Sequence, residues 1–98
     1  TSSGVGRKGR EFWGPYAISK FAVEGMMQTW ACEVEKTPIR VNCINPGATR
    51  TSMRASAFPG EDRDLLATPE DLMPTYLYLM SDDSKNINGQ SLDAQAKK

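Results

Sequence analysis

The chain has 98 residues, which is enough for one modest hydrophobic core and too few for two domains. Twelve basic and twelve acidic side chains cancel, so no field of the whole chain favours nucleic acid or an anionic membrane. No apolar run approaches the roughly 20 residues that a membrane-spanning helix needs. We therefore predict neither a nucleic-acid partner nor a membrane partner.

The first four residues, Thr1 to Gly4, lack an initiating Met and the order of a signal peptide, so we expect the natural start to lie upstream. Cys32 and Cys43 each fall in an apolar run, a position typical of small buried side chains. A secreted disulfide framework would place cysteines differently, so the prediction is a cytoplasmic protein. Histidine is absent and neither Cys has a second ligand at metal-binding spacing, so no metal site is predicted.

Residues 1–14 have a loop composition of Gly, Ser and basic side chains, and a long helix is predicted from about Pro15 to Glu35. Apolar residues cover most of its circumference, so it should pack against a sheet and a second surface. Residues 39–44 form a short apolar run typical of a buried parallel strand, ended by Asn45-Pro46-Gly47. Residues 48–67 are predicted to be a mobile excursion with one short helix.

Thr68, Pro69 and the following acids form a helix start, and residues 72–80 supply its apolar body. Pro74 should delay or kink that helix, because it lacks a backbone donor. Residues 89–94 are predicted to be the last strand and 95–98 a frayed tail. This alternation of helix and strand predicts an α/β layered fold.

Tyr16 and Lys20 lie four residues apart and therefore on one face of the predicted helix. A phenol is almost wholly protonated at neutral pH, and a neighbouring ammonium favours its phenolate form. Tyr16 can then serve as a general acid and base, while the Ser3 hydroxyl hydrogen-bonds the same substrate oxygen. The chemistry implied is carbonyl reduction or its reverse. A simpler interpretation is a solvated Lys20 that pairs with Glu24.

Four motifs together resemble the short-chain dehydrogenase/reductase family over the whole chain. They are the serine segment 1–4, the Tyr16-x-x-x-Lys20 pair, residues 40–47 (RVNCINPG) and Asn88-Gly89-Gln90. The resemblance implies a Rossmann-type doubly wound parallel sheet. It also implies hydride transfer between NAD or NADP and a small-molecule carbonyl–alcohol pair.

Mapped residue by residue, the resemblance makes Ser3, Tyr16 and Lys20 catalytic. It assigns cofactor contacts to Tyr16, Lys20, Pro46, Gly47, Thr49 and Thr51. Ser2 is a rival for Ser3, but its spacing to Tyr16 is one residue longer than the family pattern.

Two departures from the family pattern matter. The Gly-rich turn that holds the pyrophosphate has no counterpart here, so residues 1–98 are expected to be the C-terminal segment of one domain whose N-terminal nucleotide-binding half is absent. We expect this segment alone to be inactive, and NAD and NADP both remain open. The ending Asp93-Ala94-Gln95 replaces the usual Asp-Gly-Gly. It is similar to a bacterial branch labelled oxoacyl-(acyl-carrier-protein) reductase-like, which makes an acyl thioester one candidate substrate.

Three other features have interpretations that involve no function. Arg7, Lys8 and Arg10 are interpreted as a solvated loop edge, because no aromatic platform accompanies them. Asn42 is interpreted as structural. Phe12, Trp13 and Met53 can form an apolar substrate wall or part of the core, and both readings stay open.

We also predict a homo-oligomer with Met26, Met27 or Trp30 near the interface, although the absent half can cover the same surface. A non-catalytic truncated fragment that serves only as an oligomeric interaction module remains the alternative function.

Overall fold

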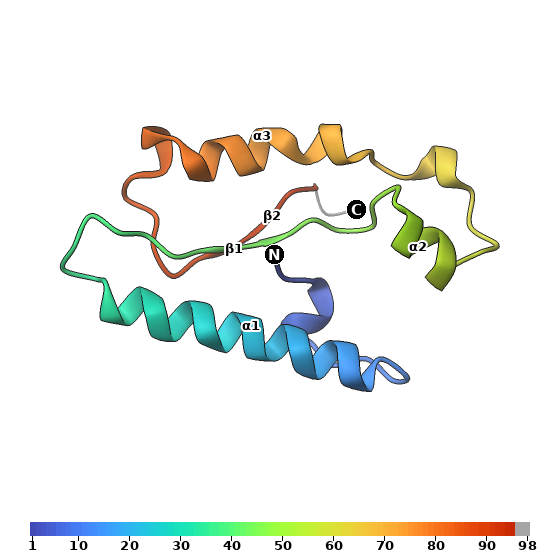
Figure 1. The fold of residues 1–98 in the computed structure, drawn as a ribbon, viewed down its shortest axis with the longest axis horizontal. Coiled ribbons are helices and arrows are strands. Elements are labelled where there is room, and N and C mark those ends of the chain that lie inside the picture. The colour runs from blue at the N-terminus through green and yellow to red at the C-terminus, as the bar shows by residue number, and fades with distance from the viewer. Residues whose placement is uncertain (96–98) are drawn as a thin grey trace.

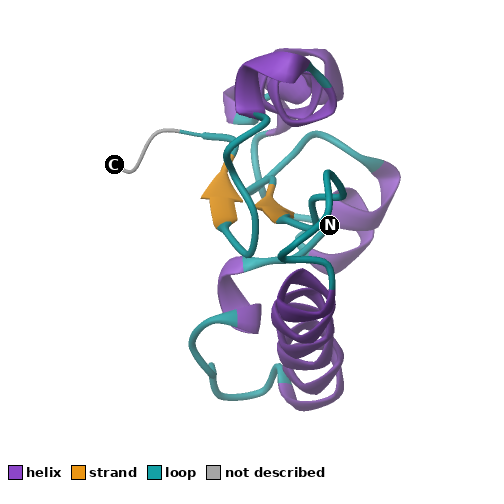
Figure 2. Cartoon of the chain, turned by 90° about the vertical axis from the view of Figure 1, so that its left-hand side faces the viewer, coloured by secondary structure: helices purple, strands orange, loops and turns teal. Residues whose placement is uncertain are grey.

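The computed structural model describes residues 1–95 and places a small parallel sheet between two helices. Strands β1 (Cys43–Asn45) and β2 (Ser91–Asp93) pair in parallel, with Ile44 opposite Leu92. Helix α1 (Gly14–Glu33) covers one face of the sheet and α3 (Pro69–Met80) covers the other (Figures 1 and 2). The expected α/β class is confirmed.

Helix α1 buries one narrow stripe, made of Ala17, Glu24, Met27 and Ala31. This spacing of seven, three and four residues follows one helical face. Met27 is only 3% exposed, whereas Met26 and Trp30 lie largely outside this stripe. Placing Met27 at an interface between subunits was therefore wrong, because its side chain is in the core of the chain. The homo-oligomer itself stays a prediction.

The strands are shorter than the sequence pattern indicates, because asparagine side chains take over the pairing next to them. Asn88 Oδ1 accepts from the Val41 amide at 2.9 Å, and Asn42 binds Ile87 and Gln90 through its two amide atoms at 3.0 Å each. Side-chain bonds of this kind satisfy backbone groups without a regular ladder. The structural role expected of Asn42 is confirmed.

The excursion after β1 contains helix α2 (Ser52–Ala57). One short 3-10 turn, Arg63–Leu65, precedes α3, and another, Asp82–Ser84, follows it. A third such turn, Gly4–Gly6, begins at the last residue of the serine segment, with Ser3 as its N-cap. The Arg54 guanidinium binds both carboxylate oxygens of Glu61 at 2.8 and 2.9 Å. The expected short helix is present, and this bidentate pair closes the segment that follows it.

Helix α3 begins at Pro69 as expected, with Thr68 and Asp71 forming a reciprocal capping box. The Thr68 hydroxyl accepts from the Asp71 amide, and the Asp71 carboxylate accepts from the Thr68 amide. Pro74 does not delay the helix, which runs through it without interruption.

At the end of the chain, Gln95 donates two hydrogen bonds, so the predicted fraying is wrong at that residue. Residues 96–98 of the expected tail lie outside the described part. Within residues 1–95, no helix has the length and apolar character needed to cross a membrane.

The capping box gives a stability prediction. Thr68→Ala should lower the free energy of unfolding of the complete protein by about 1 kcal/mol, because one amide of the first turn loses its acceptor. Thr68→Ser keeps the hydroxyl and is the matched control. Urea unfolding followed by circular dichroism measures both, and equal stability of the alanine and serine variants would contradict the capping role.

Candidate active site

One open cleft of about 1510 Å³ brings the predicted site residues together from separate parts of the sequence. Its lining includes Ser3 from the first loop, Tyr16 and Lys20 from α1, and Pro46, Gly47, Thr49 and Thr51 from the loop after β1. Parallel α/β sheets place such loops at the carboxyl ends of their strands, where ligands are usually bound. Every residue that the sequence nominated therefore lies on this cleft.

Tyr16 and Lys20 adjoin each other as the helical spacing predicts. The Lys20 Nζ lies 5.6 Å from the centre of the Tyr16 ring, within the range of a cation–π contact. Within residues 1–95 the Tyr16 hydroxyl forms no hydrogen bond, and Lys20 donates one, to the Thr1 carbonyl at 3.1 Å. A phenol and two of the three ammonium protons are thus left for a ligand.

The simpler interpretation of Lys20 as an ion-pair partner of Glu24 is wrong in this part of the chain. The Oε1 of Glu24 accepts instead from Ser91, Ser2 and Arg7, at 2.6, 3.0 and 3.4 Å. Lys20 forms no ion pair among the described residues. Its ammonium lines the cleft, while Glu24 is buried one turn further along the helix.

The two candidate serines have different surroundings. Ser2 is 1% exposed and its hydroxyl donates to Glu24. Ser3 is half-buried on the cleft, and its hydroxyl accepts a long hydrogen bond of 3.4 Å from the Val5 amide, which leaves the hydroxyl proton for another acceptor. The hydroxyl proton of Ser2 is thus taken by Glu24, whereas that of Ser3 stays available on the cleft.

The serine segment packs directly on α1 because Gly6 has no side chain. A Cβ at Gly6 would lie 2.9 Å from the Lys20 carbonyl oxygen and 2.8 Å from Ser2 Oγ. The backbone at Lys20 cannot move aside without disturbing the helix, so a larger residue would push the segment away from it. Gly6 therefore sets the separation of the Ser3 and Tyr16–Lys20 segments.

The loop after β1 is held by its own side chains at two points. Asn45 Oδ1 accepts from the Gly47 amide at 3.1 Å, which makes a local turn, and the Thr49 hydroxyl donates to the Gly47 carbonyl at 3.0 Å. The Thr51 hydroxyl accepts from the Arg54 amide and begins α2. The Thr51 side chain is thus a helix cap as well as part of the cleft lining.

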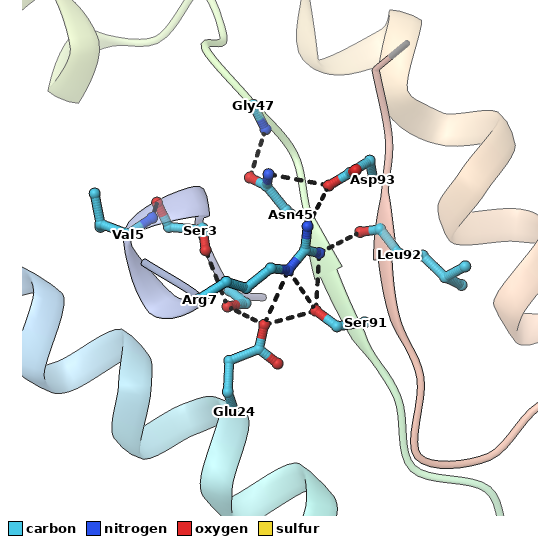
Figure 3. Close-up of polar contacts among 10 residues, drawn as sticks. Ser3, Val5, Arg7, Glu24, Asn45, Gly47, Ser91, Leu92 and Asp93 are labelled. Atoms are coloured by element: carbon cyan, nitrogen blue, oxygen red, sulfur yellow. Dashed lines mark hydrogen bonds and ion pairs between the residues drawn. The ribbon is translucent and has the colours of Figure 1, made fainter. Parts of the chain in front are cut away.

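A partly buried polar cluster that sequence reasoning missed connects these segments. Arg7 binds Asp93 Oδ1 at 2.6 Å, Ser91 Oγ at 2.8 Å and Glu24 Oε1 at 3.4 Å (Figure 3). It also donates to the Leu92 carbonyl at 3.3 Å. The Arg7 side chain is 32% exposed, so it lies at the surface as expected, but its guanidinium has partners that the sequence did not indicate. One indication of this cluster is present in the sequence: Glu24 follows Lys20 by four residues, so it lies on the same side of the helix.

The electrostatics of Glu24 follow from these contacts. Burial alone would raise the pKa of Glu24, but hydrogen bonds from Ser91, Ser2 and other donors outweigh it and lower the pKa below the usual 4.5. Burial and the neighbouring Glu24 carboxylate raise the pKa of the Cys43 thiol, so Cys43 stays protonated. Cys43 is buried as expected, whereas Cys32 is exposed, contrary to its expected burial.

The apolar residues near Tyr16 form a wall of the cleft. Trp13 meets the Tyr16 ring edge-on at 5.9 Å and Phe58 at 6.0 Å between centroids. Phe12 and Met53 line the same cleft and are 96% and 76% exposed. These two residues are therefore not core in the described chain. No cluster of three or more metal-binding side chains occurs within residues 1–95.

Comparison with known proteins gives one family. Residues 1–62 match the family model described as short chain dehydrogenase. An Escherichia coli K12 protein described as the uncharacterized oxidoreductase YciK is 63% identical over 97% of this chain and 37% of its own length.

Solved structures agree. A short chain dehydrogenase from Shigella flexneri complexed with NADP and one from Escherichia coli complexed with NADPH are each 62% identical, with TM-scores of 0.94 and 0.93. Each match covers 97% of this chain and 39% of the other. The chain thus spans less than two fifths of the length of these relatives.

The buried Glu24 carboxylate of this cluster gives a prediction about pH. Because the pKa of Glu24 is lower in the folded protein than in the unfolded one, its contribution to stability is present above about pH 4.5 and is lost as the pH falls through the lowered value. Glu24→Gln should lower the free energy of unfolding of the complete protein at pH 7 by about 1–3 kcal/mol. The free energy of unfolding of this variant should also fall less steeply as the pH is lowered.

Glu33→Gln, an exposed glutamate on the same helix, is the control for this experiment. Urea unfolding from pH 7 to pH 3 gives the stability curves of the wild type and of the two variants. Parallel curves for the wild type and Glu24→Gln would show that Glu24 is not the group responsible.

Proposed function

The chain belongs to the short-chain dehydrogenase family, and on this premise we propose that the complete protein carrying it is an NAD(P)-dependent oxidoreductase. It interconverts a carbonyl and an alcohol by hydride transfer. The observation that carries this proposal is the cleft, which gathers Ser3, Tyr16, Lys20 and the loop 46–51. A hydroxyl, a phenol and an ammonium line this one cleft together with apolar side chains.

Tyr16 is proposed as the general acid and base. Its hydroxyl has no partner within residues 1–95, so it is free to bind the substrate oxygen. In the reductive direction Tyr16 gives its proton to that oxygen, and in the oxidative direction it takes the proton back. The ammonium of Lys20 lies 5.6 Å from the ring centre and places a cation beside Tyr16.

Ser3 and Lys20 have supporting roles in this proposal. The Ser3 hydroxyl donates to the substrate oxygen and stabilises the charge that develops on it. Lys20 keeps two protons free, which suits the two hydroxyls of a ribose. Its contact with the Thr1 carbonyl holds the ammonium close to the serine segment.

The described residues fit the nicotinamide end of a dinucleotide. The loop 46–51 supplies backbone groups on one wall of the cleft, and Lys20 supplies a cation on another. When bound, the nicotinamide supplies or accepts the hydride. NADP or NAD is the proposed cofactor, and the NADP and NADPH complexes of the two similar structures favour NADP.

The substrate is proposed to carry an apolar group beside its carbonyl. Trp13, Phe58 and Met53 give the cleft an apolar side next to Tyr16, and apolar surface attracts apolar substituents. An acyl thioester and a simpler ketone both fit this description. Assembly as a homo-oligomer and a cytoplasmic location belong to the same proposal.

Replacing the proposed acid tests the function directly. Tyr16→Phe in the complete protein should lower kcat about a hundredfold or more, because it removes the transferred proton while keeping the ring. Tyr78→Phe, on α3, is the matched control and should leave kcat unchanged. Turnover of NADPH with a panel of ketones measures both, and near-normal kcat for Tyr16→Phe would refute the assignment.

Lys20→Met separates the ammonium from its aliphatic stem. It should weaken NADPH binding about tenfold or more and also lower kcat, because both the ribose contact and the cation beside Tyr16 are lost. Lys36→Met, beyond the end of α1, is the control. Titration calorimetry gives the Kd. If Kd and kcat both equal those of the wild type, Lys20 has only a structural part.

A further inference from the structure

The side chain of Gln95 fastens the loop that follows β1. Its amide nitrogen donates to the Pro46 carbonyl and to the Ala48 carbonyl, at 2.8 Å each. The two protons of one amide group thus bridge the carbonyls on either side of Gly47. Gln95 is half-buried, so water competes only partly for these bonds.

The contact extends the pairing of β1 and β2 beyond the strands. Asn45 donates to Asp93 at 3.1 Å, and the Ala94 amide donates to the Asn45 carbonyl at 2.9 Å. Residues 93–95 therefore run beside residues 45–48. At Gln95 a side chain replaces the backbone donor, because the loop has turned away from the regular ladder at Gly47.

Gly47 is fitted to the amide of Gln95. It has a φ of +75°, which glycine adopts without strain, and a Cβ there would lie 2.9 Å from Gln95 Nε2. A glycine-containing loop has many conformations to lose when it orders. Two bonds from one side chain remove much of that freedom before any ligand arrives.

The side chain at position 95 must reach both carbonyls and donate to each of them. Asparagine would be one methylene shorter, and glutamate would place a negative charge against two carbonyl oxygens. Glutamine combines the needed length with two donors and no charge.

We propose that Gln95 is a positioning residue that holds the loop 46–51 in the conformation that receives the nicotinamide end of the cofactor. The inference rests on the proposed function. Gln95 acts through the Pro46 and Ala48 carbonyls and touches neither substrate nor Tyr16. Its effect should therefore fall on the part of the cofactor next to this loop and spare the adenosine end.

Two probes separate these parts in the complete protein: NADPH, and 2′-phospho-ADP-ribose, which lacks the nicotinamide ring. Gln95→Met removes both donors and keeps the side-chain length. In titration calorimetry it should raise the Kd of NADPH about tenfold and leave the Kd of 2′-phospho-ADP-ribose within about twofold of the wild-type value. Gln90→Met, an exposed glutamine just before β2, is the matched control and should change neither value.

Gln95→Glu is the second variant and covers the case in which Gln95→Met does not fold. Its carboxylate faces two carbonyls, so it should raise the Kd of NADPH further than Gln95→Met does. The Kd of 2′-phospho-ADP-ribose should again stay near the wild-type value. An unchanged NADPH Kd in the variants would overturn the inference, as would an equal loss with both probes, since that indicates general structural damage.

The wild type provides the reference that separates the two proposals. If the wild type binds NADPH and the Gln95 variants bind it equally well, the positioning role fails and the proposed function stands. If the wild type binds neither NADPH nor NADH, the proposed function fails, and the positioning role is overturned with it.

Discussion

The guanidinium of Arg7 is the group on which the arrangement of this site depends. It sits between the Glu24 carboxylate of α1 and the Asp93 carboxylate of β2, and it belongs to the loop that carries Ser3 (Figure 3). Burial alone would lower the pKa of Arg7, but Asp93 and Glu24 outweigh it and raise the pKa, so the cation persists. One planar, five-donor group thereby joins helix, loop and strand, a task for which a lysine lacks the geometry.

The joined segments are those that carry the proposed chemistry. Glu24 follows Lys20 by one turn, so fixing Glu24 fixes the rotation of α1 about its axis and hence the direction of Lys20 and Tyr16. Ser2 donates to the same carboxylate and holds the adjacent Ser3. Asp93 accepts from Asn45, which starts the loop 46–51. The contacts of Arg7, Glu24 and Asp93 therefore fix how the serine, the Tyr16–Lys20 pair and the loop lie relative to one another.

The sequence was informative where local chemistry decides the structure. The capping pattern at Thr68, the proline-started helix at 15 and the Tyr16–Lys20 spacing depend on neighbours within four residues, and each was predictable. Strand lengths were not, because the side chains of Asn42 and Asn88 replace the ladder beside β1. The partners of Arg7 were also hidden, since Ser91 and Asp93 lie more than 80 residues away along the chain and meet it only after folding.

The polar contacts of Glu24 with Ser2, Arg7 and Ser91 form a polar seam between α1 and the sheet. Burying these polar groups costs desolvation free energy that apolar contacts would not cost. Replacing a buried ion pair with apolar residues is often neutral or stabilising, so stability alone does not explain Glu24. Apolar contacts, however, allow a helix to slide or rotate by small amounts, whereas Glu24 Oε1 has three donors from the first loop and β2 that it meets in one register. In the proposed site a phenol and a hydroxyl meet one substrate oxygen, so a displacement near 1 Å is costly. We infer that the seam is polar because it fixes position.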